Sequence, residues 1–361
     1  MSIPIMTVTN KAIGGYFNLE LASRGSFPHD DGILLNTGRN AIEYILRSLG
    51  VVKHVYVPYY TCIVVIEPLE KLGIEFSYYH IDKNLEIAEH ISVSEGEYVI
   101  YTNYFGLKDK YVRELIESGV YFNHLIIDNA MAYYAQAWEN IPTAYCPRKF
   151  VGIPDGGIAY INNGIEVPET DYSYDRVSHL IKRYDLDAEG GYQDFHINED
   201  GLMGQPIKRM SQFTQALMRS IDYEQVKSLR KRNFAILHNA LASSNALSLP
   251  EPKSYDCPLI YPYLCNDKGL KKHLISKRIY VATYWPNTYD WCKPEDWEWN
   301  LADCCLALPI DQRYDEADMQ RIIKEINNYY DMELKVKRLA QEEVLNILQE
   351  TDKEFTPPSP L

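Results

Sequence analysis

Lys149 lies in the segment YCPRKFVGIPDGGIAYIN, where a Gly-Gly pair begins a predicted strand seven and eight residues later. Most lysines in proteins are solvated surface cations. A lysine enclosed beside other cationic groups instead keeps its amine neutral enough to attack a carbonyl carbon and form a Schiff base. Taken alone, the segment leaves both interpretations of Lys149 open.

Asp128 ends the apolar run LIID, which reads as a buried strand. A carboxylate at the carboxyl end of a parallel strand lies where open α/β sheets bind their ligands. An aspartate at this point also commonly caps the next helix. Asp128 is therefore either a ligand-binding carboxylate or a helix cap.

Gly38 and Arg39 occupy a turn in LLNTGRNAIEYIL that opens a predicted helix. Free backbone amides and the helix dipole make such a helix start a phosphate-binding site, and the arginine adds a positive charge. The alternative is an ordinary glycine turn followed by an exposed arginine.

These segments lie in a region where short apolar runs alternate with amphipathic stretches. This alternation predicts βα units and a mostly parallel sheet. We expect strands at 54–58, 73–81, 97–105, 124–130 and 156–162. We expect helices at 39–49, 63–72 and 108–118.

The rest of the chain predicts a second, smaller unit. Residues 166–206 are polar and weakly periodic, so we expect a surface insertion of loop and short helices, of the kind that is often functional. Helices follow over 210–247, interrupted near Asp222, and then strands near 257–264, 279–283 and 304–308 and a helix over 316–330. Residues 332–348 predict a helix docked on the body or on a second chain, before a frayed tail. We therefore divide the chain into a large α/β domain (1–225), a small C-terminal α+β domain (226–330) and a terminal helix with its tail (331–361).

Composition narrows the classes of partner. The 361 residues include 36 basic and 50 acidic side chains, a net charge of −14, which disfavours nucleic acid. The seven cysteines include no CxxC pair and the nine histidines no metal-ligand spacing, so we expect free thiols and no metal centre. The sequence shows neither a membrane-spanning run nor a signal peptide, which predicts a cytoplasmic protein without a membrane partner.

Taken in order, the three segments match the parts that hold pyridoxal phosphate: a phosphate anchor, a partner for the pyridinium nitrogen and a Schiff-base lysine. From about Gly14 to Tyr330 the chain resembles the DegT/DnrJ/StrS family of sugar aminotransferases, which have the fold-type-I architecture. The segments VYVPYYTCIVVIEPLEKLGIEFSYYHID, YFGL, LIIDNA, PRKFVGIPDGG and LALPIDQRYDEADMQRIIKEI carry the resemblance.

The resemblance implies roles for the residues already singled out. Lys149 would bond to pyridoxal phosphate and later move the proton at the substrate carbon. Asp128 would pair with the pyridinium nitrogen, and Gly38 and Arg39 would present backbone amides to the phosphate.

The sequence departs from the family pattern at three cofactor contacts. Cys62 stands where an aromatic or histidine ring usually stacks on the cofactor, with Tyr60 as a neighbour that would substitute. Met131 stands where Gln or His is frequent, and Ala144 replaces a phosphate-binding Ser or Thr. Because Asp128 and Lys149 are retained, cofactor binding is better supported than transamination of a nucleotide sugar.

Several other side chains are candidates for the substrate. Asn103 and Tyr104 follow a predicted strand, and Tyr284 and Trp285 would form an aromatic wall for a sugar or simply pack in the core. Arg209 and Arg230 would either meet an anionic group or be solvated helix arginines.

The resemblance implies an aminotransferase that passes an amino group from glutamate to a keto sugar, nucleotide-linked, in surface-polysaccharide or related sugar biosynthesis. Two alternatives stay open: a pyridoxal-phosphate enzyme of another reaction type, such as elimination or dehydration, and a binding protein with an eroded site. The family also implies a homodimer with shared active sites, for which the 166–206 insertion is the candidate segment that reaches the neighbouring site.

Overall fold

A seven-stranded sheet forms the centre of the fold in the computed structural model, which describes residues 13–354. The strand order is β1-β7-β6-β5-β4-β2-β3, and only β7 runs against its two neighbours. The strands are β1 (Ile33–Leu35), β2 (His54–Pro58), β3 (Glu75–Tyr79), β4 (Glu97–Thr102), β5 (Leu125–Asn129), β6 (Thr143–Tyr145) and β7 (Gly157–Tyr160). The predicted mostly parallel α/β sheet is confirmed. Because β1 and β6 have three residues each, they show too little periodicity to be found in the sequence.

The predicted helices of this region are confirmed as α1 (Gly38–Ser48), α2 (Ile63–Leu72) and α3 (Asp109–Glu117). Helices α1 and α2 pack against each other, and their apolar side chains share one core with β1, β2 and β7. The buried Glu43 of α1 accepts hydrogen bonds from Arg47 and from Lys71 of α2, which ties the two helices together. The other sheet face belongs to a second, larger core that continues into the C-terminal segments.

The 166–206 segment contains two short helices, α4 (Ser178–Asp185) and α5 (Tyr192–Gly201), as the sequence predicts. A buried polar cluster attaches it to the body. Asp155 is fully buried and accepts hydrogen bonds from Ser173, from Arg176 at 2.9 Å and from Thr214 at 2.5 Å. Thr214 belongs to α6 (Gln212–Arg219), so one carboxylate joins the insertion, the sheet region and the following helix.

The C-terminal segments surround a two-stranded antiparallel sheet of β8 (Tyr261–Leu264) and β9 (Cys305–Leu308). Helix α7 (Tyr223–Leu241) begins at Asp222, whose side chain caps it, so the predicted interruption is confirmed. Helices α8 (Lys268–Ser276), α9 (Thr288–Trp291) and α10 (Trp297–Cys304) follow. The strand predicted at 279–283 is wrong: Arg278 has a left-handed backbone, and Ala282 makes a single bridge to Ala307, after which the chain leaves the sheet.

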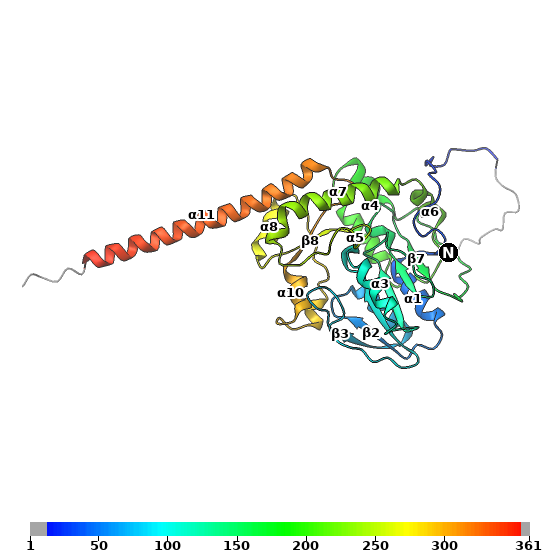
Figure 1. The fold of residues 1–361 in the computed structure, drawn as a ribbon. Helices are drawn as coiled ribbons and strands as arrows, with labels where there is room; N and C mark the ends of the chain where they lie inside the picture. The colour runs from blue at the N-terminus through cyan, green and yellow to red at the C-terminus, as the bar shows by residue number, and fades with distance from the viewer. Residues whose placement is uncertain (1–12, 355–361) are drawn as a thin grey trace, which may run out of the picture.

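The two predicted C-terminal helices form one continuous helix, α11 (Glu316–Glu354). Its first part packs on α7 and α8, and its later part extends away from the body (Figure 1). Of the two alternatives predicted for residues 332–348, docking on the body is therefore wrong, and docking on a second chain stays a prediction. The predicted tail, 355–361, lies outside the described residues.

Candidate active site

Asp128 lies at the carboxyl end of the central strand β5 and is 5% exposed. Its Oδ1 accepts a hydrogen bond from the backbone N–H of Ala130 at 2.9 Å. Burial raises the pKa of this carboxyl group, and the attraction of Lys149 and the Ala130 N–H offset part of that rise. Asp128 therefore lies at the sheet edge where parallel strands deliver ligand-binding side chains.

Lys149 ends the short 3-10 turn Pro147–Lys149 between β6 and β7, and its backbone N–H donates to the carbonyl of Cys146 at 3.3 Å. The side chain lies deep in the protein but keeps part of its surface accessible. Burial lowers the pKa of its ammonium group. The attraction of Cys62, Cys146, Asp128 and Tyr284 outweighs burial, so the pKa is raised.

This environment differs from the one that would keep the amine neutral. The sequence interpretation required neighbouring cations, whereas the groups that act on Lys149 are a carboxyl, two thiols and a phenol. In the chain by itself Lys149 is an ammonium ion opposite Asp128. The structure thus brings the two principal predicted residues close enough together for each to act on the pKa of the other.

The start of helix α1 lies beside the turn that carries Lys149. A Cβ atom at Gly38 would lie 3.1 Å from both Cβ and Sγ of Cys146, so this contact favours glycine. Thr37 caps the helix, since its side chain accepts from the Asn40 N–H at 3.0 Å. The amides of Gly38 and Arg39 have no partner inside the helix because they belong to its first turn.

Arg39 is not the exposed arginine of the alternative interpretation. Its side chain is 12% exposed, and Nη1 lies 3.0 Å from Oε2 of Glu67 on α2. The other carboxylate oxygen of Glu67 accepts the N–H of Gly204, which follows α5. Arg39 therefore links the start of α1 to α2 and the insertion.

Cys62 lies at the start of α2 and within the electrostatic reach of Lys149, Asp128 and Arg39. Burial raises the pKa of its thiol, with the attraction of Lys149 as the main opposing effect. Tyr60 is not free to substitute for it as a stacking ring. That ring is 1% exposed and packs between the rings of Tyr104 and Trp285.

The two other departures from the family pattern are buried. Ala144 lies on β6 directly opposite Asp128 in the parallel ladder. Met131 is fully buried in the larger core, and its carbonyl lies close to Gly106. Ala144 therefore flanks the predicted site, whereas contact of Met131 with a cofactor stays a prediction.

The four predicted substrate residues divide between core and site. Asn103 donates to Asp109 at 2.7 Å and accepts from the Lys108 N–H at 3.0 Å, while the Tyr104 hydroxyl donates to the Tyr60 carbonyl at 2.9 Å. Trp285 is 6% exposed in the same aromatic group. Contact of these three residues with substrate stays a prediction.

Tyr284 is the member of this set that lies close enough to Lys149 to act on its pKa. It is half-buried, and burial raises the pKa of its hydroxyl against the attraction of Lys149 and Arg230. It reaches this position from the C-terminal segments, 135 residues after Lys149. Cys146 is a neighbour of Lys149 that the sequence interpretation missed, since nothing in its spacing marks it.

Within residues 13–354 no group of three or more His, Cys, Asp or Glu side chains is arranged to hold a metal ion, and no helix there is long and apolar enough to cross a membrane.

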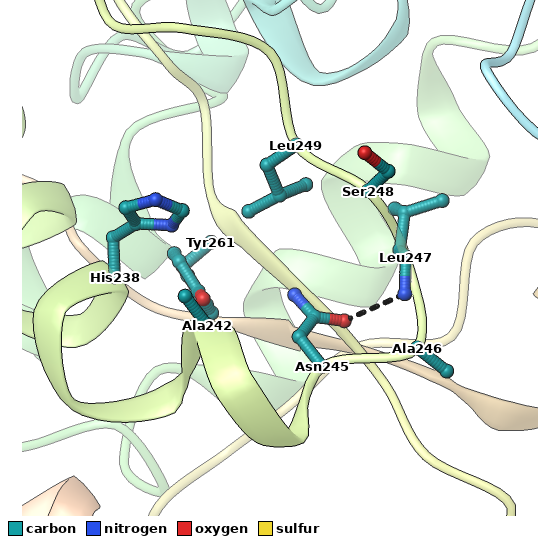
Figure 2. Close-up of a pocket in the computed structure, with 8 residues that line it drawn as sticks. All are labelled: His238, Ala242, Asn245, Ala246, Leu247, Ser248, Leu249 and Tyr261. Atoms are coloured by element: carbon teal, nitrogen blue, oxygen red, sulfur yellow. Dashed lines mark hydrogen bonds between the residues drawn. The ribbon is translucent and has the colours of Figure 1, made fainter.

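A separate hollow between the end of α7 and β8 is shown in Figure 2. Its lining residues, which include His238, Asn245 and Tyr261, are none of the predicted site residues.

No family model and no curated protein matches this sequence. Solved structures do match, over more than four fifths of both chains. A DegT DnrJ EryC1 StrS aminotransferase from Brucella abortus is 18% identical, with a TM-score of 0.57 and coverage of 82% of this chain and 85% of that one. The sugar aminotransferase CalS13 from Micromonospora echinospora is 12% identical, with a TM-score of 0.60 and coverage of 82% and 86%. S. venezuelae DesV, solved in complex with a ketimine intermediate, is 16% identical, with a TM-score of 0.59 and coverage of 82% and 84%.

The chain has the fold of these aminotransferases. The fold-type-I architecture expected from the sequence is thereby confirmed, with its mostly parallel seven-stranded sheet and a small second sheet. At 12–18% identity the likeness establishes the fold-type-I architecture, and the chemistry has to be argued from the residues of the site.

Proposed function

We propose that the protein is a pyridoxal-phosphate-dependent aminotransferase that passes an amino group from glutamate to a keto sugar. The observation that carries the proposal is the proximity of Lys149 and Asp128, which act on each other's pKa, at the carboxyl edge of the sheet and beside the start of α1. A buried lysine, a buried carboxylate and a helix start are the three groups that this cofactor requires. Solved structures of the same fold include a putative sugar aminotransferase from Streptococcus pneumoniae in PLP and PMP forms.

The residues of the site fit the cofactor. Bound pyridoxal phosphate supplies an electron sink that stabilises negative charge on the substrate carbon. Asp128, held by the Ala130 N–H, would keep the proton on the pyridinium nitrogen. The amides of Gly38 and Arg39 would bind the phosphate, and the absence of a Cβ at Gly38 lets Cys146 approach the helix start.

Lys149 has two roles in this proposal. Its amine would hold the cofactor covalently and, once displaced by the amino donor, would move the proton at the substrate carbon. Attraction to Cys62, Cys146, Asp128 and Tyr284 outweighs burial and raises the pKa of the amine, so Lys149 must lose a proton before it attacks a carbonyl.

The function is tested by following the visible absorbance of the cofactor-loaded protein. We expect this absorbance to be lost when glutamate is added and to return when a keto sugar is added. Transfer of ¹⁵N from glutamate to a nucleotide-linked keto sugar would support the full proposal. Release of an unsaturated sugar with no nitrogen transfer would instead support the elimination alternative.

An anionic sugar nucleotide needs a positively charged wall in a protein of net charge −14. Two basic stretches of the chain, one at Lys208 and one at 180–183, have lysines that are already paired with carboxylates: Lys208 lies 3.7 Å from Glu169, and Lys182 lies 2.7 Å from Asp194. The nucleotide part of the substrate therefore rests on the family resemblance alone. Measuring amino transfer to nucleotide-linked, phosphorylated and free keto sugars tests whether the substrate carries a nucleotide.

We also propose that the protein is a homodimer in which the 166–206 insertion contacts the neighbouring chain. Large apolar side chains of α4 and α5 face outward, among them Ile181 (55% exposed), Tyr184 (92%) and Ile197 (63%). Exposed apolar groups of this density are typical of interaction surfaces. Light scattering on the purified protein tests the assembly: a dimer that Ile181→Asp with Tyr184→Asp converts to a folded monomer would support it, and a wild-type monomer would contradict it.

A further inference from the structure

Arg230 of helix α7 is a buried cation, only 2% exposed. Its guanidinium donates to three acceptors: the Leu259 carbonyl at 2.8 Å, the Phe150 carbonyl at 3.0 Å and the side chain of Gln312 at 3.2 Å. The guanidinium carbon also lies 4.8 Å from the centre of the Phe150 ring. Arg230 is therefore neither a solvated arginine nor an open anion site, the two alternatives that the sequence allowed.

A buried guanidinium normally needs a carboxylate in contact, because desolvation of an unpaired charge is costly. Among the described residues Arg230 makes no ion pair within 4 Å, and the nearby Asp311 pairs with Arg313 at 2.7 Å. The charge of Arg230 is thus balanced mainly by backbone carbonyls and an aromatic face. A neutral side chain would fill the same volume at a lower cost of desolvation. The arrangement therefore indicates that the N–H donors of Arg230 have a specific role.

The acceptor shared by this group is the carbonyl of the residue after Lys149. The Phe150 carbonyl takes one hydrogen bond from Arg230 and a second from Gln312 at 2.9 Å, which fills both of its lone pairs. The Phe150 N–H donates to the Pro147 carbonyl at 2.9 Å. Because Arg230 and Gln312 also bond to each other, they form a closed triangle with Phe150.

We propose that Arg230 and Gln312 are positioning residues that hold the turn carrying Lys149 against the C-terminal segments, so that the amine stays within reach of the cofactor. The inference rests on the proposed function. Lysine has a flexible four-carbon side chain, so the place of its amine depends on a fixed backbone. A displacement of about 1 Å at a reacting group costs up to about 100-fold in rate.

The test compares Gln312→Ala and Arg230→Lys with the wild-type protein and with Arg232→Lys. Arg232 lies on the same helix and binds Asn233 and the Tyr314 carbonyl, so its variant is a matched control that leaves Phe150 untouched. Each protein is mixed with pyridoxal phosphate, and the rate of formation of the borohydride-reducible bond to Lys149 is measured together with the pH midpoint of the visible band. We expect both positioning variants to form the bond about 10-fold more slowly and to shift the midpoint, and the control to do neither.

If the hydrogen bonds of Arg230 and Gln312 to Phe150 serve stability alone, the result is different. In that case the melting temperature falls while the bond-forming rate and the pH midpoint stay at wild-type values, which would overturn the proposal. Gln312→Ala removes one of two donors to the carbonyl, so it keeps the test decisive if Arg230→Lys fails to fold.

Hydrogen exchange of the cofactor-free proteins separates this proposal from the proposed function. If wild-type protein forms no bond to pyridoxal phosphate, the proposed function fails, and the exchange of the Phe150 and Val151 amides decides the positioning role. Faster exchange at these amides in Gln312→Ala, with the rest of the chain unchanged, would support it. Exchange equal to wild type would overturn it.

Discussion

Glu298 accepts a hydrogen bond from the backbone N–H of Ile81 at 2.7 Å, across 217 residues of sequence. The carboxylate is fully buried, and its second oxygen lies 3.1 Å from Nδ1 of His80. It joins the segment after strand β3 to helix α10. Tyr104 and Trp285 belong to the same buried core as Ile81 and as Leu301 of α10.

Glu298→Ala is expected to lower the free energy of unfolding by about 1–3 kcal/mol, because the buried Ile81 N–H loses its acceptor. Denaturant unfolding measures the change. Glu295→Ala is the matched control, since that side chain is exposed in the same segment. Equal stability of the two variants would contradict the structural role given to Glu298.

Sequence patterns predicted most of the sheet and the helices α1, α2 and α3, because their apolar periodicity is strong. They also placed Asp128 near the end of a strand and Lys149 before the strand that begins at the Gly-Gly pair, which is where the structure has them. Sequence patterns could not predict the contacts of Tyr104 and Arg230, since each side chain bonds to a partner more than 40 residues away. A tyrosine after a strand looks the same in sequence whether its hydroxyl meets a substrate or the Tyr60 carbonyl.

Asp128→Asn is expected to leave the reducible bond between Lys149 and pyridoxal phosphate intact and to slow the reaction with glutamate by about 100-fold or more. The amide has nearly the shape of the carboxyl group but no charge to keep a proton on the ring nitrogen. Stopped-flow absorbance with glutamate measures the rate. A rate within about twofold of wild type would contradict the role assigned to Asp128.

Cys62 is expected to react slowly with iodoacetamide at neutral pH, because burial raises the pKa of its thiol. Loading with pyridoxal phosphate should slow the reaction further, since Cys62 lies beside Lys149 and Asp128. Mass spectrometry follows each cysteine separately. Cys292 serves as the internal control, because burial raises its pKa to about 12 and it lies outside the site; equal protection of both thiols would argue against a cofactor beside Cys62.

His29 is expected to make the protein less stable in acid. Burial lowers its pKa to about 4, and Nε2 lies 2.9 Å from the Tyr133 carbonyl. Since the unfolded chain binds a proton near pH 6.5 and the folded chain does not, stability is full above pH 6.5 and is lost as the pH falls toward 4.

Comparison of unfolding at pH 7 and pH 4.5 in His29→Asn and wild type measures this effect. Asparagine tolerates the left-handed backbone of residue 29 and does not titrate in this range. The variant should lose about 1–3 kcal/mol less stability than wild type between the two pH values. The exposed His90→Asn is the control and should follow wild type; an equal loss in His29→Asn would contradict the assignment.

The most direct test of the central claim is reduction of the pyridoxal-phosphate-loaded protein with borohydride, followed by peptide mapping of the labelled lysine. The account predicts one stable label, on Lys149, and its disappearance in a folded Lys149→Ala protein. A label on another lysine, or none in well-folded wild-type protein, would contradict it.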